Sequence, residues 1–158
     1  MHWKILSGCM SETSVPAQAL VDSNVLIALV DERDVWHAAA QQLLLSDSVR
    51  AMRLVYLDCV VAESLSTLGR RLEEKKRSIE FAALIDRLFI LAPLDELVWV
   101  FPEAQTFFTP ALGLMRQTFG KLNFNDALIV AACRGLEINT LLSFDPDFDD
   151  ITDLIRLK

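Results

Sequence analysis

The sequence predicts an α/β protein with three layers, in which helices cover both faces of a mostly parallel central sheet. Short β-like apolar runs alternate along the chain with longer segments of helical periodicity. Strands that are separated by one or two helices are joined by right-handed crossovers, which make the strands parallel. The length of 158 residues, 53% of them hydrophobic, suits one domain with a sizeable core.

The first half of the chain is expected to contain two strands and two helices. In order, these are a strand around Val21, an amphipathic helix over 34–45 opened by Asp34 as its cap, a strand over 53–57 and a helix over 59–73. On the last of these helices the apolar residues recur at helical spacing: Val61, Leu65, Leu68 and Leu72. Glu63 lies on the opposite, polar side of that helix, so it is not forced into the core.

The second half is expected to be mainly helical, with two late strands. A helix over 78–91 ends near Pro93, and the segment 95–120 is mostly helical but broken by Pro102 and Pro110. The next helix spans 126–134, with Asn125 as its cap and Gly135 just beyond its end. A strand over 138–144 follows, and 154–157 adds an edge strand.

We assign residues 1–18 to an N-terminal extension and residues 19–158 to the α/β domain.

Composition limits the class of protein. The apolar runs are far shorter than the roughly 20 residues that cross a bilayer, which predicts no membrane association. The three widely spaced cysteines form no Cys-x-x-Cys pair and predict reduced thiols in a cytoplasmic protein. A net charge of −7 argues against nucleic-acid binding through a broad basic surface.

Four acidic residues, Asp22, Glu63, Asp126 and Asp145, each lie where an apolar segment begins, ends or turns polar. In a parallel sheet the binding crevice lies beyond the carboxyl ends of the strands, where Asp22 and Asp145 are expected. Several carboxylates brought to one crevice would form an oxygen-only site for a hard divalent cation.

Taken singly, each acid also has a structural interpretation. Asp22 could cap the following helix, and Asp126 could complement a helix dipole. Glu63 could be a solvated residue of a polar helix face. Asp145 could be a turn residue, with Asp147 or Asp149 as the ligand in its place.

Four segments, in this order, resemble the motifs of PIN domains, metal-dependent ribonucleases that include the VapC-like toxins of type II toxin–antitoxin pairs. Val21-Asp-Ser-Asn-Val-Leu-Ile27 resembles the D-x-N start, and Glu63 stands where the family has a helical Glu. Asn125-Asp-Ala-Leu-Ile129 resembles the D-A helix start, and Ser143-Phe-Asp-Pro-Asp-Phe148 resembles the T-x-D-x-D-F turn, with Ser in place of Thr. Together they cover about residues 19 to 150.

The resemblance implies a PIN-like α/β/α fold and a metal-dependent endoribonuclease that hydrolyses RNA phosphodiester bonds. Asp22, Glu63, Asp126 and Asp145 would then be the catalytic residues and would hold one or two Mg²⁺ or Mn²⁺ ions. The residues implied to orient these carboxylates are Asn24, Ser143 and Asp147. The resemblance also implies an RNA substrate, an antitoxin protein partner and a homodimer.

Two other functions remain open at this point. One is a non-catalytic PIN-like binding or scaffold module. The other is an α/β phosphatase that forms an aspartyl-phosphate, although such an enzyme would need a second Asp at position 24, which is Asn. The aromatic residues Trp36, Trp99, Phe107 and Phe108 are interpreted as core or interface residues, with base stacking as the alternative.

Overall fold

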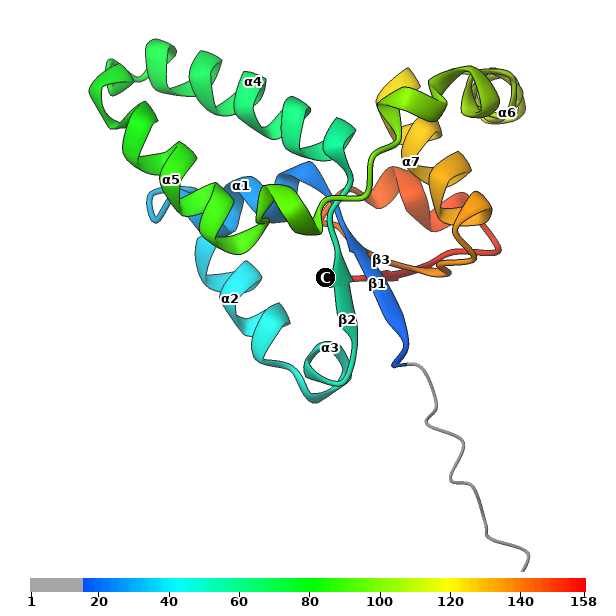
Figure 1. Cartoon of the computed structure of the whole chain (residues 1–158), viewed down its shortest axis with the longest axis horizontal. Helices are drawn as coiled ribbons and strands as arrows, with labels where there is room; N and C mark the ends of the chain where they lie inside the picture. The colour runs from blue at the N-terminus through cyan, green and yellow to red at the C-terminus, as the bar shows by residue number, and fades with distance from the viewer. Residues whose placement is uncertain (1–15) are drawn as a thin grey trace, which may run out of the picture.

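A computed structural model describes residues 16–158 and contains a four-stranded sheet in the order β2-β1-β3-β4, with all neighbouring strands parallel (Figure 1). The strands are β1 Gln18–Val21, β2 Arg53–Val55, β3 Thr140–Leu142 and β4 Ile155–Leu157. The predicted parallel sheet and its late edge strand are therefore confirmed. The strand expected over 138–144 is shorter than predicted.

Helices lie on both faces of the sheet, as predicted (Figure 1). One face is covered by α1 Ser23–Val30, α2 His37–Leu45, α3 Asp47–Arg50, α4 Asp58–Glu74 and α5 Phe81–Leu91. The other face is covered by α6 Ala104–Gln117 and α7 Phe124–Gly135. Short 3-10 turns occupy η1 Ser78–Glu80, η2 Leu94–Glu96, η3 Phe101–Glu103 and η4 Pro146–Asp150.

The strand β1 shows why the sheet is buried on both sides. Ala19 and Val21 pack into the core beneath α1, α2, α4 and α5, whereas Leu20 packs into the core beneath α6 and α7. All three side chains are fully buried. Successive side chains of a strand point to opposite faces, so a central parallel strand reads as a continuous apolar run.

The helix predicted over 34–45 begins three residues later than expected, at His37. Asp34 does not cap it directly. Its carboxylate instead accepts the N–H of Trp36 at 2.9 Å and pairs with Arg71 of α4 at 2.9 Å, which holds the preceding turn. An Asp side chain bonds its own backbone two residues on as readily as it caps a helix.

The prediction that Pro110 breaks the helical region is wrong, because Pro110 lies inside α6. Proline removes one N–H and clashes with the carbonyl four residues earlier. Both Pro110 and Thr106 are exposed, so that carbonyl can be hydrated. Pro102 lies at the start of η3, where a missing N–H costs little.

The helix α7 begins earlier and is capped differently than predicted. Asn123, rather than Asn125, is the cap: its side chain accepts the N–H of Asp126 at 3.0 Å. The Asp126 carboxylate accepts the Asn123 N–H at 3.3 Å in return, which completes a capping box. Gly135 is the last helical residue rather than the first beyond the helix.

Residues 1–15 lie outside the described part of the chain, so the domain boundary after residue 18 stays a prediction, as does the reduced state of Cys9. Cys59 and Cys133 are free thiols. Within residues 16–158, no helix is long and apolar enough to cross a membrane.

A carboxylate cluster at the carboxyl edge of the sheet

Asp22 lies at the centre of a hydrogen-bond network directly after β1. Its backbone N–H donates to the carbonyl of Leu142 at 3.0 Å, which fixes it beside the end of β3. Its carboxylate accepts the Ser23 N–H at 2.7 Å, the Ser143 hydroxyl at 2.6 Å and the Asn24 amide at 2.7 Å. Asp22 is therefore both the cap of α1 and a fixed carboxylate at the sheet edge.

Asn24 and Ser143 lie next to Asp22, where the resemblance placed them. The Asn24 amide also donates to the Ser143 oxygen at 3.1 Å, and its own oxygen accepts the Phe144 N–H at 3.1 Å. The Ser143 oxygen accepts the N–H of Asp145 at 3.0 Å. These bonds attach the segment that leaves β3 to the first turn of α1, so the orientations of Asp22 and Asp145 are coupled.

The three acids of the turn after β3 have different surroundings. Asp145 caps η4 by accepting the Asp147 N–H at 2.9 Å. The Asp147 carboxylate lies 3.7 Å from the ammonium of Lys121, and Asp149 binds Arg156 at 2.6 Å. Asp147 therefore contacts Asp145 through its backbone, whereas the carboxylates of Asp147 and Asp149 lie against basic side chains.

Glu63 and Asp126 come from the helices on either face of the sheet. Glu63 is half-buried in the first half of α4, close to Ser23, and burial raises its pKa. Asp126 is buried at the start of α7, and its pKa is raised to about 7 by burial and then by the charge of Asp22. The charges of Asp145 and Glu63 raise it further.

The four predicted acids are thus close enough to act on one another. Burial is the main cause that raises the pKa of Asp22 to about 6, and Glu63 and Asp145 add to it. The bonds from Ser143 and Ser23 oppose this increase because they favour the charged form. Buried carboxylates that repel one another favour a cation in their midst.

The donor set fits a hard divalent cation by chemistry and charge, since all four side chains offer oxygen. The distances between the four carboxylates do not match those of a metal site. Among residues 16–158, no three His, Cys, Asp or Glu side chains stand at the mutual distances of a metal site. The four carboxylates are therefore coupled through their charges without standing at metal-ligand distances from one another.

The family model for the PIN domain matches residues 19–154. The chain belongs to the PIN-domain family. Solved structures with a similar fold include VapC20 of Mycobacterium tuberculosis, described as a sarcin-ricin loop cleaving toxin. It shares 21% identity, with a TM-score of 0.65 over 85% of this chain and 95% of that chain. VapBC2 of Rickettsia felis, bound to a promoter DNA fragment, shares 15% identity, with a TM-score of 0.58 over 89% and 97%. No curated protein sequence matches the chain.

Two further residues of this PIN domain support the cluster and were not singled out from the sequence. Asn123 bonds the Asp126 carboxylate through its N–H. Arg156 of β4 donates to the carbonyl of Ser143 at 3.1 Å and forms two bonds with Asp149. Its side chain is only 5% exposed. A lone arginine between apolar residues of an edge strand was the signal available in the sequence.

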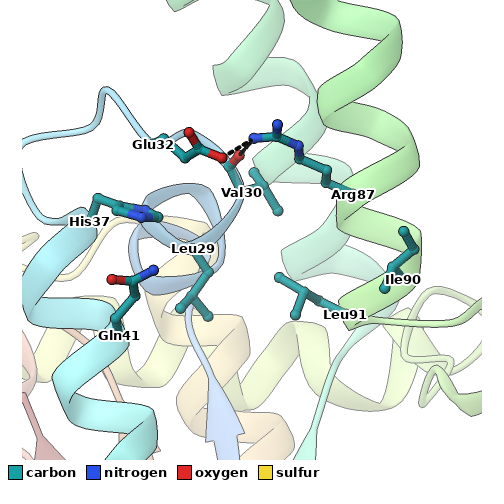
Figure 2. Close-up of a pocket in the computed structure, with 8 residues that line it drawn as sticks. All are labelled: Leu29, Val30, Glu32, His37, Gln41, Arg87, Ile90 and Leu91. Atoms are coloured by element: carbon teal, nitrogen blue, oxygen red, sulfur yellow. Dashed lines mark hydrogen bonds and ion pairs between the residues drawn. The ribbon is translucent and has the colours of Figure 1, made fainter.

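The PIN domain also has an apolar pocket of about 300 Å³ between α2 and α5, away from the four acids (Figure 2). Leu29, Ile90 and Leu91 line it. The pair Glu32–Arg87, at 2.9 Å, closes one side, and the His37 Nδ1–H donates to the Ala28 carbonyl at 2.7 Å. Ile90 is 77% exposed, so this pocket presents apolar surface to solvent.

Proposed function

We propose that this PIN domain is a metal-dependent endoribonuclease that hydrolyses RNA phosphodiester bonds and serves as the toxin of a cytoplasmic toxin–antitoxin pair. The observation that supports it most is the convergence of Asp22, Glu63, Asp126 and Asp145 at the carboxyl edge of the sheet. The family match supplies the reaction class. The similarity to VapC20 and VapBC2 supports the toxin role.

In this proposal the four carboxylates hold one or two Mg²⁺ or Mn²⁺ ions. A bound ion would supply an activated water and charge neutralisation for attack on phosphorus. Ser143 and Asn24 keep the Asp22 oxygens fixed by their hydrogen bonds, so that little reorganisation is needed on substrate binding. The chain carries a net charge of −7, so in this proposal RNA is attracted locally at the bound metal rather than over a broad face.

The test is cleavage of single-stranded RNA by the purified full chain. We expect cleavage with Mg²⁺ or Mn²⁺, none in EDTA, and a loss of at least about a hundredfold in Asp22→Asn. Asp47→Asn, a change in an exposed acid of α3, is the matched control and should cleave normally. Cleavage that persists in EDTA and in Asp22→Asn would contradict the proposal. RNA binding without cleavage at any metal concentration would instead support the scaffold alternative.

We also propose an antitoxin and a homodimer as partners. The exposed apolar surface between α2 and α5 is suited to an apolar segment of another protein (Figure 2). An antitoxin arginine that enters the carboxylate cluster would form bidentate bonds there. Co-expression with the product of a neighbouring short reading frame should yield a stable complex and relieve growth arrest. Light scattering that detects only monomer at tens of micromolar would contradict the homodimer.

A further inference from the structure

Trp36 and Phe144 form a parallel aromatic pair beside the carboxylate cluster. Their ring centroids are 5.0 Å apart, with an angle of 14° between the planes. Phe144 lies between Ser143 and Asp145 in sequence, and its N–H is bonded to Asn24. Trp36 is 51% exposed, although one of its faces is covered by Phe144. An indole that served only to fill the core would be buried more completely.

The pair forms one wall of a pocket of about 460 Å³ at the same edge of the sheet as Asp145. The pocket is lined by Trp36, Ala39, Phe144, Pro146, Arg156 and Lys158. The Ser143 N–H donates to the Leu157 carbonyl at 3.1 Å, which places Lys158 level with the end of β3. Arg156 is neutralised by Asp149, so the exposed Lys158 supplies the available positive charge.

We propose that this pocket, named here the Trp36 pocket, is a nucleotide subsite for single-stranded RNA. An unpaired base stacks on the free face of Trp36, and the adjoining phosphate meets Lys158. The inference rests on the proposed ribonuclease function and adds a residue that selects substrate. Base stacking on an aromatic side chain tolerates any base, so the subsite distinguishes unpaired from paired RNA rather than one sequence from another.

Other exposed aromatic residues of the described chain lack this combination. The exposed Phe108 lies at 50° to the half-buried Phe124, so the two rings present no extended flat surface. Trp99 is 55% exposed but has no aromatic partner within residues 16–158. The Trp36 pocket combines parallel rings, an adjacent cation and a position one residue from Asp145, and these three features together match a nucleotide.

Binding is measured in an Asp22→Asn background, which prevents cleavage, with a short fluorescein-labelled single-stranded RNA of mixed sequence. Trp36→Ala and Trp36→Leu should weaken binding by about five- to a hundredfold, because they remove the stacking surface. Trp36→Phe should restore most of the affinity. Trp99→Ala is the matched control, because it removes an indole of similar exposure, and should bind as the parent does.

Two further readouts do not depend on the stability of a Trp36 variant. In Trp3→Phe/Trp99→Phe, Trp36 is the single tryptophan, and its emission should be quenched by the single-stranded RNA but not by the same RNA annealed to its complement. Lys158→Ala should reduce the slope of the logarithm of the binding constant against the logarithm of salt concentration by about one, the value expected for the loss of one phosphate contact.

The inference is wrong if Trp36→Leu binds RNA as tightly as the parent, or if RNA leaves Trp36 emission unchanged. It is also wrong if Trp36 emission changes with protein concentration alone, because the pocket would then be an interface between copies. If Trp36 variants that retain Asp22 cleave RNA as well as the wild type does, the subsite is overturned and the proposed ribonuclease stays intact. Trp36-dependent RNA binding without cleavage in metal would support the subsite and overturn the ribonuclease.

Discussion

At the scale of single residues, Asp22 is both the cap of α1 and the centre of the acidic cluster. It caps α1 through the Ser23 N–H, and the same carboxylate is bound by Ser143 and Asn24 at the centre of the acidic cluster. A helix N-terminus carries unpaired N–H groups and positive partial charge, so a carboxylate is stabilised there. The bond to the helix N-terminus therefore stabilises the charged form of the buried Asp22 carboxylate, which desolvation disfavours.

Asp126→Asn tests the charge of the cluster without metal. The folded pKa of Asp126 is raised from 3.8 to about 7, chiefly by burial and then by Asp22. Because the folded state retains a proton that the unfolded state has lost, this acid costs stability as pH rises through that range. At pH above about 7, Asn should stabilise the metal-free fold by on the order of 1 kcal/mol, and the gain should vanish near pH 4. Thermal melts in EDTA at both pH values measure it.

The same variant tests the proposed metal ligands. Mn²⁺ at a hundredfold excess over its Kd should stabilise the wild type by about 2.7 kcal/mol, whereas Asp126→Asn should lose most of that gain. Asn can still accept the Asn123 N–H, so the helix cap is kept. A variant that retains the full Mn²⁺-induced rise in Tm, or a wild type with none at millimolar Mn²⁺, would exclude Asp126 as a ligand.

At the scale of elements, the end of one helix positions an acid of the cluster. The capping box of α7 uses Asp126 as its third helical residue, so the bond that begins the helix also orients the carboxylate. Similarly, η4 begins at Asp145, whose side chain accepts the Asp147 N–H. For Asp126 and Asp145, element boundaries therefore determine where the carboxylates point, whereas Glu63 projects from the interior of α4.

Asn123→Ala and Asn125→Ala form a matched pair for the start of α7. Loss of the true cap should cost about 1 kcal/mol, because the Asp126 N–H loses its partner. Asn125 is exposed, so its replacement by Ala should change stability by less than about 0.5 kcal/mol. Urea unfolding of both variants measures the difference. Equal losses, or a larger loss in Asn125→Ala, would contradict the assigned cap.

At the scale of the whole molecule, most arginines of the described chain are committed to acids. The paired residues are Arg33, Arg71, Arg77, Arg87, Arg134 and Arg156. Because the chain also carries a net charge of −7, its acids outnumber the remaining basic side chains, which disfavours attraction of a polyanion over a broad face. The affinity of the proposed nuclease for RNA should therefore depend more on divalent metal and the Trp36 pocket than on monovalent salt.

Arg77→Gln tests how the ends of three helices are held together. Arg77, after α4, binds Asp31 at the end of α1 and Glu80 before α5. The Arg77 and Asp31 side chains are 12% and 10% exposed, so the variant leaves a buried charge unpaired and should lose about 3 kcal/mol. Arg33→Gln, which removes an exposed pair with Glu80, is the control and should lose less than about 1 kcal/mol.

The effect of Arg77→Gln should depend on pH. Hydrogen bonds from Arg77 lower the pKa of Asp31 below 3.8. A lowered folded pKa means that the contribution is present at neutral pH and is lost as pH falls through the folded value. The difference between wild type and variant should therefore shrink in strong acid. Urea unfolding at neutral and acid pH measures it, and a constant difference would show that Asp31 is not the partner that matters.

The sequence by itself determined the alternation of strands and helices, the parallel sheet and the positions of the acids along the chain. Those features follow from local periodicity and from chain connectivity, which act over a few residues or one crossover. It did not determine the cap of α7, the continuation of α6 through Pro110, or the start of α2 at His37. In each case two local conformations of similar free energy were compatible with the sequence: a cap at Asn123 or Asn125, a continuous or broken helix at Pro110, and a cap or a turn at Asp34.

Only the tertiary structure decided which residues share the site. Ser143 reaches Asp22 across 121 positions of sequence, and Arg156 reaches the Ser143 carbonyl from the edge strand. Trp36, which follows α1, stacks on Phe144, which follows β3, so this pair joins segments that lie more than a hundred residues apart in the sequence. Asp147 donates its N–H to the Asp145 carboxylate, while its own carboxylate lies 3.7 Å from the Lys121 ammonium. Side-chain direction, burial and long-range hydrogen bonds are properties of the packed chain, so local sequence does not specify them.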